Sequence, residues 1–190
     1  RMDLDALLNL FGAATTLKRV PRSGWLLRGI TLPESVADHS YGVALVALAL
    51  ASELNASGGL DRPLDTGRIL AIAVLHDLAE SRLMDLPGPA LRHLPREVKH
   101  AAEASAMREL TGGLPSGAEL LALWEEYEAG ASPEGRLVRD ADRLEMMVQC
   151  LAYERVGSSG LDEFWATSDA ATWHFALSEQ LYALLRAGRP

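Results

Sequence analysis

Four residues in this sequence are of the types that can jointly coordinate a divalent metal ion. They are two histidines and two aspartates from three separate segments: His39, the adjacent pair His76 and Asp77, and Asp142. Imidazole nitrogens and carboxylate oxygens form the mixed ligand set that first-row divalent ions accept. A four-residue set leaves room on the ion for water and a substrate oxygen, as metal-assisted hydrolysis requires. We therefore predict one divalent ion per chain, with Mn, Co, Mg, Zn, Ni or Fe all compatible with these ligands.

The segment around His76 carries a third ionisable residue, Glu80. The surrounding stretch is apolar on nearly every face, which predicts a buried helix over residues 66–81. On a continuous helix, Glu80 would share a face with His76 and Asp77, because it lies four and three residues beyond them. Burying three ionisable groups is unfavourable unless a cation or a partner offsets the loss of hydration. This cost indicates that the three residues have a chemical role.

The elements that must position these residues all read as helices. Helical periodicity dominates the chain, and no convincing alternating strand pattern is present. The predicted helices span residues 3–17, 35–55, 66–81, 95–110, 116–129, 133–155, 161–165 and 169–187, and Ser35 with Asp38 forms a capping-box variant. We therefore predict one all-α domain, a bundle of about seven to nine helices around a central buried helix. Its core would span about residues 4–155, with a C-terminal helical extension over about 160–187.

Composition limits the class of protein further. The chain has 190 residues, of which 48% are hydrophobic, so one well-buried domain is expected. A net charge of −8, with only two lysines, argues against binding to nucleic acid. The sequence has no apolar run long enough to span a membrane and no signal-peptide pattern, and its lone Cys150 fits a reducing compartment, so we expect a cytoplasmic protein. Arg1 precedes Met2, which we expect to be the natural start.

Taken together, these residues resemble the HD-domain metal-dependent phosphohydrolases, whose pattern H…HD…D occurs here in the same order. The resemblance extends to the 5′-deoxynucleotidase branch of that superfamily over about residues 4–155. The segments that carry it are 17–25, 33–39, 76–80 with Asp85 beyond, and 123–128. It implies hydrolysis of deoxyribonucleoside 5′-monophosphates to nucleoside and phosphate, and it suggests a homodimer.

The resemblance also implies roles for residues near the metal ligands. Glu80 and Asp85 are candidates to orient the attacking water or to protonate the leaving 5′ oxygen. Arg22 would bind the phosphate, with Arg19 as the competing candidate. Trp25 would pack against the sugar and exclude a 2′ hydroxyl group. Bacterial members of the family tend to keep the arginine and tryptophan adjacent, whereas Ser23 and Gly24 intervene here, so a purely structural role for Trp25 stays open.

Several of these assignments have alternatives. Asp140 and Asp142 would point about 200° apart on a helix, so only one can face the metal. The family register favours Asp142, and Asp140 would then be solvated near Arg139 or Arg143. Glu80 could instead pair with Arg82 or Lys18, and Asp85 could serve as a cap or turn residue. Trp124 and Tyr127 form part of an apolar stripe that is better explained by packing.

Two other functions remain open at this level. The protein could be a different HD-type phosphohydrolase, acting on a cyclic nucleotide, a nucleoside triphosphate or another phosphomonoester. It could also be a metal-bound nucleotide-sensing domain without turnover, although such a domain has no need for Glu80 and an open metal position.

Overall fold

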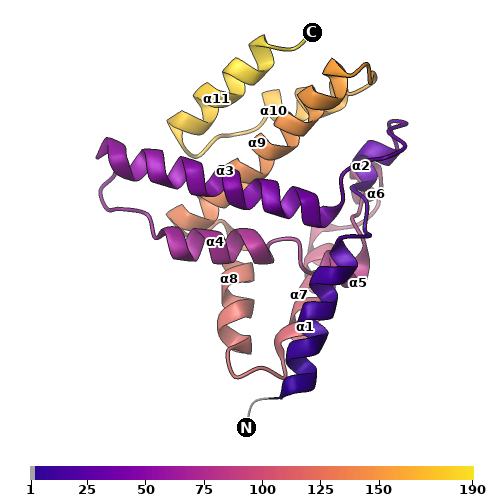
Figure 1. Cartoon of the computed structure of the whole chain (residues 1–190), viewed down its shortest axis with the longest axis vertical. Coiled ribbons are helices and arrows are strands. Elements are labelled where there is room, and N and C mark those ends of the chain that lie inside the picture. The colour runs from indigo at the N-terminus through magenta and orange to yellow at the C-terminus, as the bar shows by residue number, and fades with distance from the viewer. Residues whose placement is uncertain (1–2) are drawn as a thin grey trace.

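The computed structural model describes residues 3–190, so the expectation about Met2 lies outside the described residues. Over this range the chain forms eleven helices and no strand, with one isolated antiparallel bridge between Pro21 and Ser35 (Figure 1). The all-α prediction is therefore confirmed. The helices are α1 (Leu4–Leu17), α2 (Ser23–Leu26), α3 (Val36–Ser57), α4 (Thr66–Leu75), α5 (Glu80–Leu83), α6 (Gly88–Leu91), α7 (Arg96–Thr111), α8 (Gly117–Ala129), α9 (Pro133–Arg155), α10 (Asp162–Asp169) and α11 (Ala176–Ala187).

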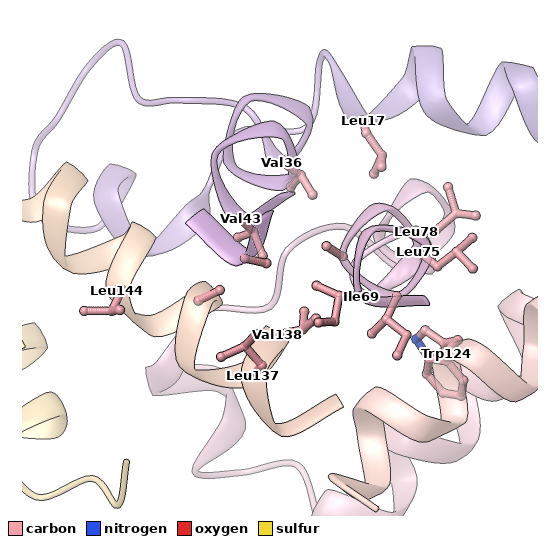
Figure 2. Packing of buried hydrophobic residues seen from close by; sticks show 14 of the residues in the cluster. Leu17, Val36, Val43, Ile69, Leu75, Leu78, Trp124, Leu137, Val138 and Leu144 are labelled. Carbon is pink, nitrogen blue, oxygen red and sulfur yellow. The ribbon is translucent and has the colours of Figure 1, made fainter. Parts of the chain in front are cut away.

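The central layer consists of α3, α4 and α9, which pack against one another (Figure 1). Figure 2 shows that Val43 of α3, Ile69 of α4 and Val138 of α9 point into the space between these helices. All three side chains are fully buried. The remaining helices pack around this layer: α8 lies on α4, α10 and α11 lie on α9, and α1, α5 and α7 contact one another. None of the helices described is long and apolar enough to cross a membrane.

The N-terminus of α3 forms as the sequence predicts. The Ser35 side chain accepts a hydrogen bond from the Asp38 amide, and the Asp38 carboxylate accepts one from the Ser35 amide. This reciprocal capping box satisfies two amide groups that a helix start leaves without partners. It fixes the first turn of α3, which carries His39.

The predicted helix over 66–81 is wrong in its C-terminal part, because α4 ends at Leu75. The His76 ring bonds through Nδ1 to the carbonyl oxygen of Ala73 at 2.7 Å. In a continuing α-helix, that oxygen would accept the amide of Asp77. The backbone instead tightens into turns in which each amide bonds three residues back, from Leu78 to Leu75 and from Glu80 to Asp77. His76 and Asp77 thus leave the helix exactly where the side chains change from apolar to ionisable.

The predicted last helix over 169–187 is also wrong at its start. Helix α10 ends at Asp169, and α11 begins only at Ala176. In the loop between them, the amides of His174 and Phe175 donate hydrogen bonds to the Asp140 carboxylate of α9. This carboxylate holds the loop in a non-helical course and anchors α11 against α9.

Candidate metal centre and substrate pocket

The four predicted metal ligands meet at one buried point, although they come from α3, from the turn after α4 and from α9. His39 Nε2 lies 3.1 Å from Asp142 Oδ1 and 3.7 Å from Asp77 Oδ2. His76 Nε2 lies 3.2 Å from Asp77 Oδ2. One ligand atom from each of His39, His76 and Asp142 lies within 4.8 Å of the others. The fold therefore brings together groups that are 103 positions apart at most (142 − 39).

The hydrogen bonds of the two histidines fit a metal ion. In both rings Nδ1 has an acceptor: Glu145 Oε2 at 2.5 Å for His39, and the Ala73 carbonyl for His76. An Nδ1–H donor leaves a lone pair on Nε2, which is the form that binds metals. Both Nε2 atoms are buried, and among the described residues neither has a partner in hydrogen-bond geometry. Buried polar atoms normally have partners, so these two atoms fit a ligand from outside the chain.

Two further residues support the ligands, and the sequence interpretation did not assign either of them to the site. Glu145 orients His39 and lies three residues after Asp142, on the same face of α9. Tyr127 donates its hydroxyl hydrogen to Asp142 Oδ2 at 2.7 Å, and its ring meets His76 edge-on. The ring of Tyr127 packs against the core as predicted, and its hydroxyl adds a contact with the site that the sequence did not predict. A side chain at Gly42 would collide with Glu145, so glycine at this position permits the close approach of α3 and α9.

The charges of the cluster balance one another. Burial alone would raise the pKa of the Asp77 carboxyl, but His76 and Arg22 beside it hold that pKa below its usual range. Burial likewise opposes ionisation of Asp142, and His39 lowers its pKa. Burial lowers the pKa of His39, as does Arg22, but the contacts with Asp142 and Glu145 raise it to about 10. The negative charges of the carboxylates thus favour positive charge at this point, either as protons on the histidines or as a bound divalent cation.

Glu80 is one of the two predicted catalytic acids, and its surroundings shift its pKa. Burial raises its pKa, and the negative charges of Asp77 and Asp85 raise it further. Its Oε2 atom is buried and has no hydrogen-bond partner within residues 3–190. The alternative ion pair with Arg82 is not formed, because Arg82 bonds to Glu109 and Asn9. Glu80 therefore has the properties of a carboxyl group that keeps its proton near neutral pH.

Arg22 reaches the acidic cluster, whereas Arg19 lies exposed on the turn after α1. Arg22 Nη1 is 3.5 Å from Asp77 Oδ2 and 3.6 Å from Asp85 Oδ1, and these carboxylates raise its pKa despite the opposing effect of burial. Asp85 also accepts the Ser23 amide at 2.5 Å, while the Ser23 hydroxyl donates to the Asp85 carbonyl oxygen. Asp85 thus bonds to the first amide of α2 and contacts Arg22, which agrees with the alternative of a capping residue, while its catalytic role stays a prediction.

The backbone between Glu80 and Asp85 is strained at Met84. This residue has φ +66° and ψ 166°, a region that is essentially confined to glycine. It is the one non-glycine residue with positive φ in the described part of the chain. Such strain costs on the order of 1–3 kcal/mol and persists only where the surroundings impose it. Here the turn at Met84 directs the chain after α5 so that Asp85 lies beside Arg22.

A pocket of about 300 Å³ adjoins the cluster on the side of Arg22 and Asp85. Its walls are mainly apolar, and they come from α2, from the segment after Asp85, and from α9 and α10. Trp25 lies in this wall but is only 1% exposed, and it packs against the tilted ring of Phe164 with 4.3 Å between ring centroids. Trp25 is thus both a core residue and a boundary of the pocket. Phe164 lies outside the range of the sequence resemblance, and only the tertiary structure reveals its place.

The predicted environment of Asp140 is wrong. Asp140 is fully buried rather than solvated, and its carboxylate accepts the amides of His174 and Phe175 together with His174 Nδ1. It points away from the metal cluster to which Asp142 contributes, as their spacing on α9 predicts.

Comparison with known families and structures agrees with this geometry. The HD domain family matches residues 14–174, and the chain belongs to this family. A Danio rerio protein named 5′-deoxynucleotidase HDDC2 is 38% identical over 175 residues, which cover 90% of this chain and 82% of that protein. The Homo sapiens protein of the same name is 38% identical over 151 residues, covering 78% of this chain and 69% of that protein.

Two solved structures have the same overall fold. A conserved hypothetical protein from Pyrococcus furiosus superimposes with a TM-score of 0.79 at 39% identity, covering 96% of this chain and 98% of that one. A protein from Magnetospirillum magnetotacticum, described as a predicted metal-dependent phosphohydrolase, gives a TM-score of 0.68 at 26% identity, covering 97% of this chain and 94% of that one.

Proposed function

We propose that this protein is a metal-dependent 5′-nucleotidase that hydrolyses deoxyribonucleoside 5′-monophosphates to deoxynucleoside and phosphate. The observation that carries the proposal is the pair of buried Nε2 atoms of His39 and His76, which face two carboxylates beside Arg22 and the pocket. The activity in the names of the similar vertebrate proteins supports the same reaction.

In this proposal, His39, His76, Asp77 and Asp142 hold one divalent ion, which could be Mn, Co, Mg, Zn, Ni or Fe. When bound, the ion would supply Lewis-acid chemistry for the phosphate group and would favour ionisation of a water molecule. Glu145 and Tyr127 keep His39 and Asp142 in the orientation that ligation requires.

Arg22 binds the phosphate group. Its guanidinium is planar and permanently charged, so it can form two parallel hydrogen bonds to a phosphate. Contact with Asp77 and Asp85 directs Nη1 toward the cluster before substrate binds. Prior orientation reduces the entropy lost when the reacting groups are brought together. The exposed Arg19 is the weaker candidate for this role.

Glu80 supplies the proton for the leaving 5′ oxygen. Its raised pKa keeps Oε2 protonated near neutral pH, and that atom is not occupied by another described side chain. Asp85 acts mainly by holding Arg22, because its carboxylate is already engaged by Ser23 and Arg22.

The apolar pocket holds the nucleoside. It begins at Arg22, so a phosphate bound there would direct the sugar toward Trp25 and the base toward the wall that includes Phe164. Close packing of Trp25 against C2′ would exclude a ribose hydroxyl group, which gives the preference for deoxyribose. The contribution of α10 to the pocket wall supports the prediction of one domain that includes the C-terminal extension.

We also propose that the protein is a homodimer in the cytoplasm. An exposed apolar stripe formed by Leu4, Leu8 and Phe11 on α1 is a surface that a second subunit could cover. Light scattering of the purified protein would test the dimer. The reducing compartment is supported by the single buried cysteine, Cys150.

The proposed activity can be tested directly. The protein is stripped of metal, reloaded with Mn²⁺, Co²⁺ or Mg²⁺, and given dAMP, AMP, dCTP or a cyclic dinucleotide while phosphate release is measured. Hydrolysis of dAMP well above AMP supports the proposal. Activity confined to dCTP or the cyclic dinucleotide, or no activity at all, contradicts it. The Asp77→Ala variant is the control, since it should lose both bound metal and turnover while its circular dichroism stays helical.

A further inference from the structure

Glu34 occupies the junction between the phosphate-binding arginine and the pocket wall. Its carbonyl oxygen accepts the Arg22 amide at 3.0 Å, and its own amide donates to the Tyr153 hydroxyl oxygen at 2.9 Å. Its carboxylate Oε1 accepts the indole Nε1–H of Trp25 at 2.8 Å. We propose that Glu34 is a positioning residue that fixes the orientation of Trp25 in the pocket and thereby sets the discrimination between deoxyribose and ribose. This inference rests on the proposed function.

The aromatic neighbours of Trp25 pack against its ring, and neither of them accepts a hydrogen bond from its N–H. Phe164 lies against the indole at 4.3 Å with 30° between the planes, and Tyr153 meets it edge-on at 5.4 Å. A ring rotated by half a turn about its bond to Cβ would carry the N–H away from the Glu34 carboxylate. The hydrogen bond to Glu34 is directional, and a buried indole N–H without an acceptor is unfavourable. This bond therefore selects one orientation of the ring.

The backbone hydrogen bonds of Glu34 position Arg22, whereas its side-chain hydrogen bond positions Trp25. The bridge between segments 20–22 and 34–36 uses main-chain atoms, including Arg22 N to Glu34 O and Val36 N to Val20 O. A substitution of the Glu34 side chain leaves these bonds in place, so Arg22 should remain positioned. Only the restraint on Trp25 is removed, so we expect a change in the selectivity between deoxyribose and ribose substrates.

Glu34 also lies close to the support of a metal ligand, which provides a competing explanation to be tested. One atom each from Glu34, His39 and Glu145 lies within 4.8 Å of the others. Burial raises the pKa of Glu34, and the charge of Glu145 raises it further. If Glu34 acted through His39, its loss would weaken metal binding. If it acts through Trp25, the metal content should remain at the wild-type level.

The experiment compares wild type with Glu34→Leu and Glu34→Gln. The leucine variant removes the acceptor, whereas the glutamine variant keeps an oxygen that can accept the indole bond. The ratio of kcat/KM for dAMP to that for AMP should fall about tenfold in Glu34→Leu and return toward wild type in Glu34→Gln. If Glu34→Leu does not fold, Glu34→Met removes the carboxylate acceptor with a side chain of similar length and should lower the same ratio.

The chain contains a matched control. Trp165 Nε1 donates to Glu154 Oε2 at 3.1 Å, an indole–carboxylate bond whose acceptor does not line the substrate pocket. Glu154→Leu removes a comparable bond together with the ion pair to Arg189, and it should still leave the dAMP to AMP ratio unchanged. A similar fall in both leucine variants would mean that general destabilisation, and not the orientation of Trp25, changes the ratio, and this would overturn the inference.

A readout independent of activity is the set of indole N–H resonances in the NMR spectrum. The chain has four tryptophans, and the Trp25 signal is identified by its loss in Trp25→Phe. This signal should shift upfield in Glu34→Leu and recover in Glu34→Gln. Three results in Glu34→Leu would contradict the proposed role of Glu34: an unchanged Trp25 signal, an unchanged substrate ratio or a loss of bound metal. Absence of any preference for dAMP in the wild type would instead contradict the proposed function.

Discussion

Helix α9 carries two sets of acidic residues that differ in which groups bind their carboxylates. Asp142 and Glu145 face the metal cluster, where the Nε2 atoms of two histidines have no hydrogen-bond partner among residues 3–190. Asp140 faces the loop before α11, Glu134 lies at the N-terminal end of α9, and donors of the protein itself saturate both carboxylates. The second set closes its own network and therefore stabilises the fold. The first set leaves buried atoms available, which is the property expected of a site that binds something from outside.

The largest expected effect is the loss of activity in Asp142→Asn. This change keeps the shape of the side chain and its bond to Tyr127 but removes one charge from the metal ligands. Phosphate release from dAMP should fall by on the order of a thousandfold. Helical content measured by circular dichroism should be retained. A variant with nearly normal turnover would place Asp142 in the structural set.

Asp140→Ala should have the opposite profile, with a large effect on stability and a small one on metal content. It leaves the amides of His174 and Phe175 without their acceptor, which should lower the free energy of unfolding by about 3 kcal/mol. The melting temperature should fall by about 6–12 °C. Thermal unfolding and metal analysis of the same sample check both parts. Loss of the ion from the folded variant would contradict the separation of the two sets.

Glu145→Gln sharpens the comparison within the first set. The amide can still contact His39 Nδ1, but it no longer supplies the negative charge that makes the imidazole a stronger ligand. Metal affinity should fall tenfold to hundredfold, or roughly 1–3 kcal/mol, with little change in stability of the metal-free protein. Competition with a chelator measures this shift. An unaltered affinity would show that Glu145 does not support the ligand.

The smallest expected effect concerns the acid sensitivity of Glu134. Its hydrogen bonds with Arg62 hold its pKa at about 2, below the ordinary value of 4.5. A depressed carboxyl pKa adds stability above the ordinary value and loses it as the pH falls from 4.5 toward 2. Arg62 is largely exposed, so the contribution should be on the order of 1 kcal/mol. The melting temperature measured at pH 7, 4 and 3 should fall more steeply for wild type than for Glu134→Gln. An equal fall in both proteins would show that the ionised Glu134 does not contribute to stability.

The sequence predicts the helices and the meeting of the four ligands better than it predicts where helices stop. Periodicity reports which face of a helix is buried, and it located α3, α8 and α9 closely. The end of α4 depends on the His76 ring taking the Ala73 carbonyl, and the start of α11 depends on Asp140. Both are side-chain bonds to the backbone, and such bonds leave no periodic pattern.

The supporting residues differ in how predictable they were. Glu145 could have been inferred, because it lies one helical turn after Asp142 and so shares its face. Tyr127 was read as part of an apolar stripe, since its ring follows that pattern while its hydroxyl does not. Phe164 could not have been inferred, because its approach to Trp25 depends on how α10 folds back onto α9.

The unfavourable backbone geometry of Met84 has a consequence for how the protein would fail under stress. The turn between Glu80 and Asp85 is held in shape by its contacts rather than by its own conformational preference. Mild damage to the surrounding packing should release this turn before the helices melt. Heating such variants would then inactivate the enzyme several degrees below its unfolding transition, and coincidence of the two temperatures would argue against this order of events.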